Sequence, residues 1–234
     1  MTQPYLMDQD RIKVVDNVDA IPESMWEGVD FGPGSDFAWY VNDFFTYAAG
    51  DWTVTETAGG ATEALTDEAN GVLLLTNTNT ENDLLGMQLG AEAFLPVSGK
   101  NIYFEIRIKA SEATQMDWLV GLCDTDAGLP TAAVSDGIYF VKDDDGTGIN
   151  CGCSSSSVES IEAAAATAEA DTYMVLGFKV IGTSKVEFWK DGSKLTEITT
   201  NIPTTELRLS FAIAAGSTDA RTSNVDYVKA AQQR

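Results

Sequence analysis

The stretch "KVEFWKDGSKLTEI", residues 185–198, contains two runs of alternating apolar and polar residues on either side of Asp191-Gly192. An Asp-Gly pair between such runs is the strongest short-range hairpin signal, because both central residues of the tight turn need a positive φ. Alternation with a period of two places every second side chain on the same face of a sheet. The stretch therefore predicts an antiparallel β-hairpin with one buried face.

Similar short runs, separated by turn residues, continue from about residue 50 to residue 230. The longest is "NIYFEIRIKA" (Asn101–Ala110), and others are "GVLLLTNT", "MDWLVGLCD", "GIYFVKDDDG", "TYMVLGFKVIG" and "ELRLSFAIAAG". Roughly a dozen strands at hairpin spacing argue for a two-sheet antiparallel sandwich. We therefore predict an all-β domain over residues 48–234. Within it, the alanine-rich stretch at residues 158–171 is compatible with a strand, a loop or one short helix.

The first 47 residues show neither steady alternation nor a helical period, and they contain Pro22, Pro33 and a "GPGS" turn. They are nevertheless rich in aromatic residues, which disordered tails usually lack. We therefore predict an extended N-terminal arm that docks on another subunit or partner, in preference to one that folds back on its own domain. The expected partner-binding residues are Trp26, Phe31, Phe37, Trp39, Tyr40, Phe44 and Phe45.

Charge is the dominant compositional feature, with 36 acidic residues, 14 basic residues and no histidine, for a net charge of −22. Such a charge disfavours nucleic acid, because binding to nucleic acid relies on Lys and Arg that neutralise phosphates. It also disfavours anionic membranes, and no apolar run approaches the length of a membrane span. The polar, acid-bearing N-terminus does not resemble a secretory signal peptide, so we expect synthesis in a cytoplasm.

Three cysteines are too few for a disulfide framework. Cys151 and Cys153 in "NCGCSSSS" are too close in sequence to bridge comfortably. With one further cysteine and no histidine, the ligand set for tetrahedral zinc is also incomplete. We therefore expect no cofactor, and we expect these small side chains to face the interior of a sheet.

The best metal candidate is "KDDDGTGIN", residues 142–150. Here Asp143, Asp144 and Asp145 could supply oxygen ligands to Ca²⁺, and Gly146 allows a sharp turn. The stretch lacks the twelve-residue EF-hand pattern and its closing glutamate. An acidic β-turn is therefore the favoured interpretation, with calcium as the alternative.

Glu105 stands alone in the middle of the longest predicted strand. A retaining glycosidase needs two carboxylates about 5 Å apart, and residues two and four positions further along the same face are Arg107 and Lys109. Two neighbouring cations would keep a carboxyl group ionised rather than make it a proton donor. We therefore assign Glu105 to the wet face of the sheet.

Other catalytic signatures are also missing from the sequence. The chain contains no GxSxG, Walker A or dinucleotide-binding motif. Without histidine, no side chain has an unperturbed pKa near neutrality for acid–base catalysis. We therefore expect that the protein is not an enzyme.

Several segments together resemble the concanavalin A-like lectin/glucanase (laminin-G-like) jelly roll. They are "IYFEIRIKASE", "DWLVGLCDTD", "DGIYFVKDDDG", "LGFKVIGTSKVEFWKDGSKL" and "NVDYVKA". The resemblance covers about residues 51–230 and consists of strand order and hairpin pattern. It implies a jelly-roll topology. The arm, the acidity and the small polar loops also resemble capsid decoration (cement) proteins of tailed bacteriophages.

This second resemblance implies a virion structural protein that binds and stabilises a phage head through its arm. The expected partner is the major capsid protein, the expected location is the capsid surface, and the expected state is a homo-oligomer, most simply a trimer. The alternative is a carbohydrate-binding module of a virion or cell-surface adhesin. Residues that could then recognise glycan on loops are Asp124, Asp126, Asp143 and Trp118, although Trp118 fits the interior of the sandwich better.

Overall fold

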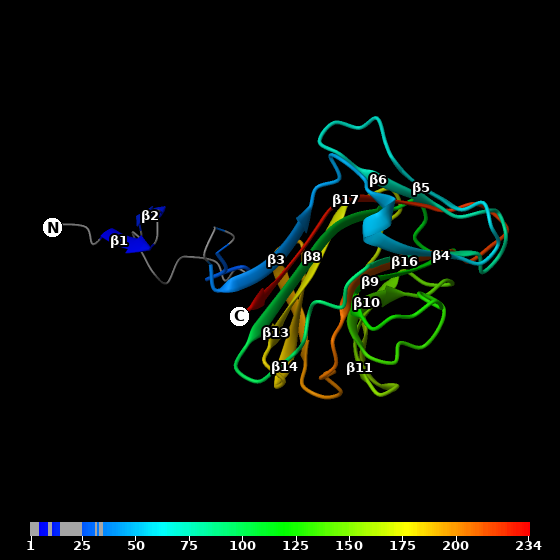
Figure 1. The fold of residues 1–234 in the computed structure, drawn as a ribbon. Helices are drawn as coiled ribbons and strands as arrows, with labels where there is room; N and C mark the ends of the chain where they lie inside the picture. The colour runs from blue at the N-terminus through cyan, green and yellow to red at the C-terminus, as the bar shows by residue number, and fades with distance from the viewer. Residues whose placement is uncertain (1–4, 9–10, 15–24, 31, 33–34) are drawn as a thin grey trace.

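The computed structural model describes residues 5–8, 11–14, 25–30, 32 and 35–234. This part of the chain contains no α-helix, and two antiparallel sheets face one another (Figure 1), which confirms the predicted fold class. No helix among the described residues is long and apolar enough to cross a membrane. Outside the sandwich sheets, β1 (Tyr5–Asp8) and β2 (Arg11–Val14) form a hairpin of their own, and η2 (Ala49–Asp51) is a single 3₁₀ turn.

One sheet has seven strands. In spatial order these are β12 (Val158–Thr167), β11 (Gly148–Ser155), β10 (Gly137–Lys142), β9 (Met116–Cys123), β16 (Arg208–Ala215), β7 (Leu84–Leu89) and β4 (Trp52–Glu56).

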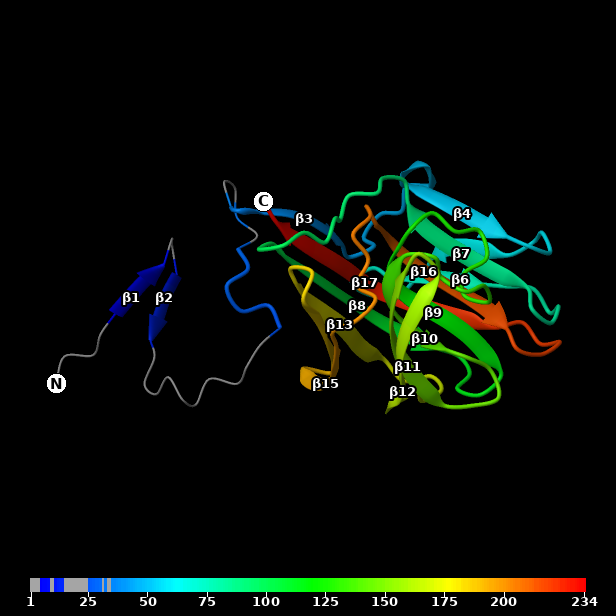
Figure 2. The same ribbon diagram turned by 90° about the horizontal axis from the view of Figure 1, so that it is seen from below.

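The other sheet has eight strands. Seven of them follow the order β15 (Ser193–Ile198), β14 (Lys185–Lys190), β13 (Met174–Ile181), β8 (Asn101–Ala110), β17 (Thr222–Gln233), β6 (Leu73–Thr76) and β5 (Thr62–Leu65). The eighth, β3 (Phe37–Asn42), also pairs with β17. The long strand β17 thus has β8 on one side and β6 followed by β3 on the other, and Figure 2 shows β3 beside it.

The hairpin predicted from Asp191-Gly192 is present. Lys190 of β14 pairs with Ser193 of β15, so the loop has two residues. Asp191 has a φ of 49° and Gly192 a φ of 77°, both in the left-handed region that this turn requires. The hairpin is confirmed in its position and its turn chemistry, and its register shifts between Phe188 and Trp189.

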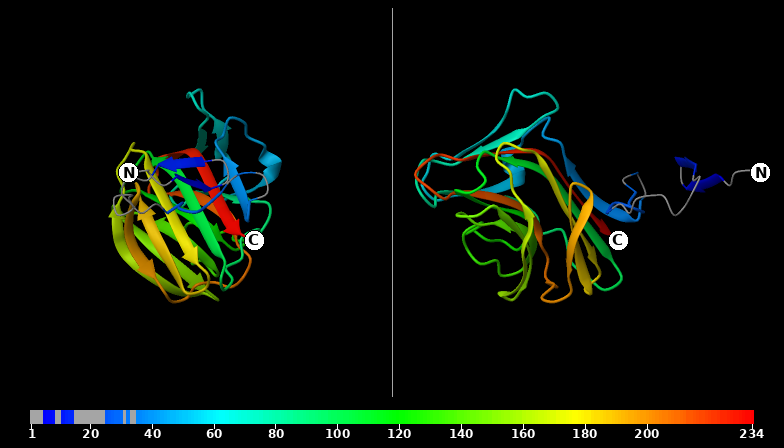
Figure 3. Two further views of the ribbon diagram at one scale, coloured as in Figure 1. Left: turned by 90° about the vertical axis from the view of Figure 1, so that its left-hand side faces the viewer. Right: turned by 180° about the vertical axis from the view of Figure 1, so that it is seen from behind.

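The two sheets lie face to face (Figure 3), and the core between them follows the alternation of the strands. In β8, Ile102, Phe104, Ile106 and Ile108 are buried in it, while the residues between them point to the outside of the sandwich. Phe104 stacks on Phe178 of the neighbouring β13 with ring centroids 4.8 Å apart. Aromatic pairs of this kind add to the free energy gained from apolar burial.

Cys151 and Cys153 of β11 both face this core, as expected from the sequence. Both are free thiols. Burial raises the pKa of the Cys151 thiol to about 12, so it stays protonated and unreactive at neutral pH.

Residues 158–167, whose conformation the sequence left open, form the edge strand β12. They pair with β11. The register shifts between Ile149 and Cys151 of β11, and β12 bulges opposite this point, where Ala164 has a φ of 51°. At the edge formed by β12 the two sheets approach each other. Ser160 Oγ of β12 lies 2.7 Å from Oγ1 of Thr200, which follows β15 of the other sheet. Strand pairing and these bonds therefore override the helix propensity of the alanines.

Residues 37–47, expected in the arm, contribute to the sandwich. β3 pairs with β17 along its whole length, from Phe37 opposite Gln233 to Asn42 opposite Val228. The side chain of Phe44 is fully buried in the main core. The sandwich therefore begins at Phe37 rather than at residue 48.

Candidate functional site

The outer face of the seven-stranded sheet, called the pocket face below, is built from the side chains that point away from the core. Leu119 and Cys123 of β9, Tyr139 of β10 and Ala212 of β16 lie on it. Leu129 and Val134 come from the loop between β9 and β10, residues 124–136, and pack onto these side chains. The loop therefore covers part of the pocket face and leaves the remainder open.

The base of this loop is fastened to the sheet by Gln88 of β7. Its Nε2 donates to the carbonyl of Asp124 at 2.8 Å and to Ser210 Oγ at 2.9 Å, and its Oε1 accepts from the amide of Asp126 at 3.0 Å. The carboxylate of Asp126 in turn accepts from the amide of Gly128 at 2.7 Å. These bonds hold the loop over the sheet.

A pocket of about 360 Å³ opens on the pocket face beside the loop. Its lining combines apolar side chains with carboxylate, amide and hydroxyl groups. The lining residues are Leu119, Pro130, Thr131, Ala132, Ala133, Val134, Tyr139, Val141, Asp143, Asn150, Glu159 and Ile161.

Tyr139 is a nearly fully buried residue of the pocket lining. Its ring lies over Gly152 of β11, where an added Cβ would come within 2.5 Å of Tyr139 Cε2. Tyr139 Oη donates a hydrogen bond of 2.6 Å to Glu159 Oε1 on β12. Burial, together with the bond to Glu159, raises the pKa of Tyr139 far above its usual value. The phenol therefore stays neutral and remains a donor to the carboxylate.

Asn150 of β11 shapes the other end of the pocket. Its Oδ1 accepts from the amide of Ala164 at 2.8 Å, at the bulge of β12, and its Nδ2 donates to Asp143 Oδ2 at 3.3 Å. The bulge thus orients Asn150, which orients Asp143. The two carboxylates lie at opposite ends of the pocket, because Asp143 follows the end of β10 while Glu159 pairs with Ser154 near the end of β11.

The three consecutive acids proposed for calcium do not act as a group. Asp143 lies in the pocket, the amide of Asp144 donates to Asp117 Oδ1 at 2.6 Å, and Asp145 has a φ of 61° in the turn. Across the described ranges of the chain, no three His, Cys, Asp or Glu residues are gathered in a way that could hold a metal ion.

Two buried charged groups fasten this acidic turn to β9. Lys142 is fully buried, and its Nζ donates to the carbonyl of Met116 at 2.6 Å. Burial lowers the pKa of Lys142 and raises the pKa of the Asp117 carboxyl group. Both side chains serve the framework of the turn and lie outside the pocket lining.

The outer face of the eight-stranded sheet, called the strap face below, is covered in part by residues 25–29, the strap. Met25 packs against Gly177, where an added Cβ would lie 2.6 Å from Met25 Cε. Trp26 stacks on Tyr103 with ring centroids 5.7 Å apart, and Lys229 Nζ lies 4.6 Å from the centre of the Trp26 ring. Together with Trp189, these residues form a small apolar cluster outside the main core.

Glu105 lies at the centre of the strap face. Its carboxylate accepts from Trp26 Nε1 at 2.6 Å and from Tyr227 Oη at 2.8 Å, and it pairs with Lys229 Nζ at 2.7 Å. Arg107 pairs instead with Asp226. Glu105 thus lies on the outer face, as the sequence predicts, but the cation that pairs with it is Lys229 and not Arg107 or Lys109. Glu105 anchors the strap to the sheet.

The aromatic residues predicted to bind a partner divide into three groups. Trp26, Phe37, Tyr40 and Phe44 pack wholly or partly against their own sandwich. Trp39 and Phe45 are exposed, with 50% and 69% of their surface accessible. Phe31 lies outside the described residues.

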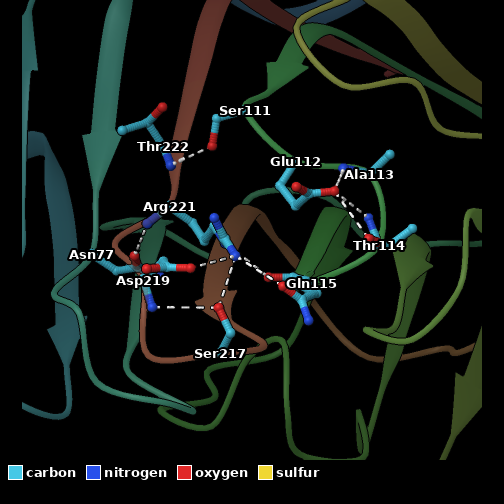
Figure 4. A network of polar contacts seen from close by, with 10 residues as sticks. All are labelled: Asn77, Ser111, Glu112, Ala113, Thr114, Gln115, Ser217, Asp219, Arg221 and Thr222. Carbon is cyan, nitrogen blue, oxygen red and sulfur yellow. Dashed lines mark hydrogen bonds and ion pairs between the residues drawn. The ribbon is translucent and has the colours of Figure 1, made fainter.

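A third polar cluster joins three loops around Arg221 (Figure 4). Its Nε donates to the carbonyl of Gln115 at 3.0 Å and its Nη2 to Ser217 Oγ at 2.7 Å, while its backbone amide donates to Asn77 Oδ1 at 2.7 Å. Nearby, backbone amides of Thr114 and Ala113 lower the pKa of Glu112. Because these groups satisfy one another, the cluster serves to hold the loops together.

Sequence reasoning named Asp143 but missed Tyr139, Asn150 and Glu159. Glu159 could not be placed without knowing that residues 158–167 form a strand. Of the other glycan candidates, Trp118 is fully buried in the core. Asp124 and Asp126 lie at the base of the loop and are not among the residues that line the pocket.

Comparisons with known proteins rest on structure alone. No family model matches the sequence, and no curated protein matches it.

Solved structures with the same fold cover most of the chain. A protein of unknown function from Shewanella oneidensis MR-1 has a TM-score of 0.59 at 15% identity, over 99% of this chain and 97% of that one. An endo-1,3-beta-glucanase from Streptomyces sioyaensis has a TM-score of 0.60 at 12% identity, over 87% of this chain and 99% of that one. Peanut lectin has a TM-score of 0.56 at 10% identity, over 85% and 98%. The chain therefore has the concanavalin A-like jelly-roll fold of glucanases and lectins.

These comparisons contradict the expectation that the protein is not an enzyme. Most of the similar structures are glucanases or other glycoside hydrolases, among them a lichenase and a Bacillus licheniformis beta-glucanase. The absence of histidine does not exclude an enzyme of this class, because glycosides are cleaved by a pair of carboxylates and need no histidine.

Proposed function

We propose that the protein binds carbohydrate in the pocket on its pocket face. The observation that supports this most directly is that aromatic, carboxylate and amide groups converge in one pocket of about 360 Å³. Ligand pockets commonly fall between about 300 and 1,000 Å³ and combine an apolar lining with a few placed polar groups. Both properties suit one or a few sugar units.

The mixed lining offers both kinds of contact that a sugar ring can make. Hydroxyl groups both donate and accept hydrogen bonds, and the carboxylates of Asp143 and Glu159 are strong acceptors for them. The C–H faces of the ring are apolar and fit Leu119, Val141 and Ile161. The fold of the chain, shared with a lectin and several glucanases, is consistent with this proposal.

A panel of neutral oligosaccharides, β-1,3-glucans and β-1,3-1,4-glucans included, tests the proposal by calorimetry on the full chain. We expect saturable binding that weakens at least about tenfold in Glu159→Gln and Asp143→Asn, because each variant loses a charged acceptor. Glu187→Gln, on the strap face, is the matched control. Chromatography of the same mixtures shows whether bound glucans are also shortened. Binding that is unchanged in both pocket variants would reject this site.

We propose as a second candidate that the protein attaches to a larger assembly, such as the surface of a phage capsid. The supporting observation is the exposure of Trp39, Val41 and Phe45, with 50%, 47% and 69% of their surface accessible. Trp39 and Val41 lie two residues apart on β3 and so point to the same side of the strand. Such an assembly would present the protein in several copies, most simply as trimers at local threefold positions.

Co-sedimentation with capsids that lack the protein tests this candidate. Removing residues 1–43 would be a poor test, because it deletes β3 and its pairing with β17. The double variant Val41→Ser, Phe45→Ser leaves the strand in place and should reduce capsid occupancy. Leu65→Ser on β5, where 42% of the leucine is exposed, is the matched control. Full occupancy by the double variant would reject attachment through these exposed side chains.

A further inference from the structure

The charges around the pocket are of one sign. Among the described residues that line it, Asp143 and Glu159 are charged and none is a lysine or arginine. Lys142 is close in sequence but points to the core side of β10, where its Nζ is bound to the carbonyl of Met116. The pocket therefore keeps two carboxylates that no neighbouring cation of its lining neutralises.

The bases of the sandwich gather mainly on the opposite side. Lys229 pairs with Glu105, Arg107 with Asp226, and Lys185 and Lys194 with Glu187, all on strands of the eight-stranded sheet. The whole chain carries a net charge of −22. The electrostatic potential at the pocket is the sum of contributions from all charges of the molecule. A cleft lined by acids on such a protein therefore concentrates cations and repels anions.

Both pocket carboxylates retain capacity for a ligand. Glu159 accepts one hydrogen bond, from Tyr139, and Asp143 accepts one, from Asn150. An ionised carboxylate has about four lone-pair sites. A donor that enters the pocket therefore finds charged acceptors at both ends.

We infer that the pocket selects sugars that carry a free amine over neutral sugars, and excludes sugars that carry a carboxylate or sulfate. This inference rests on the glycan binding proposed above and names the substrate class of that site. A protonated amine replaces one hydroxyl donor by a charged donor, which strengthens its hydrogen bond to a carboxylate. A uronate brings a like charge against Asp143 or Glu159, which opposes binding.

Three trisaccharide probes test the inference: tri-glucosamine, tri-N-acetylglucosamine and tri-galacturonate. They carry amines, neutral amides and carboxylates respectively. We expect calorimetry on the full chain, at a pH where the amines are protonated, to give an affinity for tri-glucosamine at least about tenfold above that for the acetylated probe. We expect no binding of tri-galacturonate. Raising the salt concentration from about 20 to about 500 mM should weaken the binding of tri-glucosamine and leave the binding of the neutral probe nearly unchanged.

Variants distinguish binding of the amine in the pocket from its general attraction to a protein with a net charge of −22. Glu159→Gln and Asp143→Asn should each reduce the preference for the amine several-fold, while Glu187→Gln should leave it unchanged. An equal loss in all three variants would mean non-specific attraction and would overturn the inference. Neutral or anionic probes that bind as tightly as the amine would overturn it too, with the proposed glycan site intact. If neither these probes nor the neutral panel bind, the proposed function itself fails.

Discussion

The two outer faces of the sandwich are built on the same alternating strands but differ in what those strands present. The strap face carries large side chains, Tyr103, Glu105 and Trp189 among them, and residues 25–29 cover them. On the pocket face Gly152 lies against the ring of Tyr139, and a loop covers only part of the face. One face is thus filled in part by a segment of the same chain, while the other keeps a pocket beside its loop.

The two faces also differ in how many partners their carboxylates have within the protein. On the strap face Glu105 is held by two neutral donors and one lysine. In the pocket, Glu159 is held by a single phenol and lies in an exposed position. A carboxylate with all its partners inside the protein stabilises the fold, while one with spare acceptor sites is available for recognition.

The largest effect that separates the faces is expected from Glu105→Ala. The substitution leaves Trp26 Nε1, Tyr227 Oη and Lys229 Nζ without their shared acceptor, so we expect a loss of about 2–3 kcal/mol in the free energy of unfolding. Urea unfolding followed by tryptophan fluorescence measures it. Glu105→Gln keeps an acceptor and should lose less. A neutral effect of Glu105→Ala would mean that the carboxylate does not anchor the strap.

On the pocket face, Gly152→Ala should have a somewhat smaller effect on stability but a direct one on binding. The new methyl would lie 2.5 Å from Tyr139 Cε2 and 2.9 Å from Ile161 Cδ1, so the ring must shift. We expect a loss of about 1–2 kcal/mol from overpacking, together with weaker glycan binding. Thermal unfolding and calorimetry measure the two. Retention of wild-type affinity would show that the position of Tyr139 is unimportant for the ligand.

Asp117→Asn should stabilise the protein at neutral pH by up to about 1 kcal/mol. Burial raises the pKa of this carboxyl group, so its charged form is disfavoured in the fold, and that penalty is present above the folded pKa and relieved as the pH falls through it. The asparagine Oδ1 can still accept from the amide of Asp144. Unfolding curves from pH 7 to pH 4 should therefore converge for variant and wild type. A variant less stable at pH 7 would contradict this.

Glu187→Gln, on the strap face, should act in the opposite direction and weakly. Burial alone would raise the pKa of Glu187, but hydrogen bonds from Lys185 and Lys194 outweigh it and lower the pKa. The ionised Glu187 therefore stabilises the fold at a pH above the pKa it has in the unfolded chain. This stabilisation is lost as the pH falls through its lower pKa in the folded protein. We expect a loss of about 0.5 kcal/mol at pH 7 that disappears near pH 3, because partly exposed ion pairs are screened by solvent. A loss that persists in acid would point to packing instead.

Local patterns in the sequence were sufficient for much of the fold. The hairpin at Asp191-Gly192 and the alternation of β8 depend on residues close in sequence, and both were predicted correctly. β3 was missed because it pairs with β17, nearly the whole chain away, and has only six residues. The conformation of residues 158–167 was undecidable because alanine side chains carry little periodic signal.

The pocket was less predictable than the fold for the same reason. Tyr139 and Glu159 come together only because β10, β11 and β12 are adjacent strands, and the bulge at Ala164 sets the position of Asn150. None of these relations follows from spacing along the chain. Asp143 could be named in advance because a run of three acids is visible in the sequence, although the role first considered for it, binding of calcium, needs a grouping that the described residues do not form.

The position of β17 has a consequence for how the protein is made. This strand lies between β8 on one side and β6 and β3 on the other, and it follows all three in the chain. During translation the ribosome releases it after every neighbour that it joins, so the larger sheet stays split with unpaired edges until then. Closure over such long sequence separations is slow, and the waiting edges are sites for mispairing. Chaperone dependence should therefore centre on the stage of synthesis at which β17 emerges.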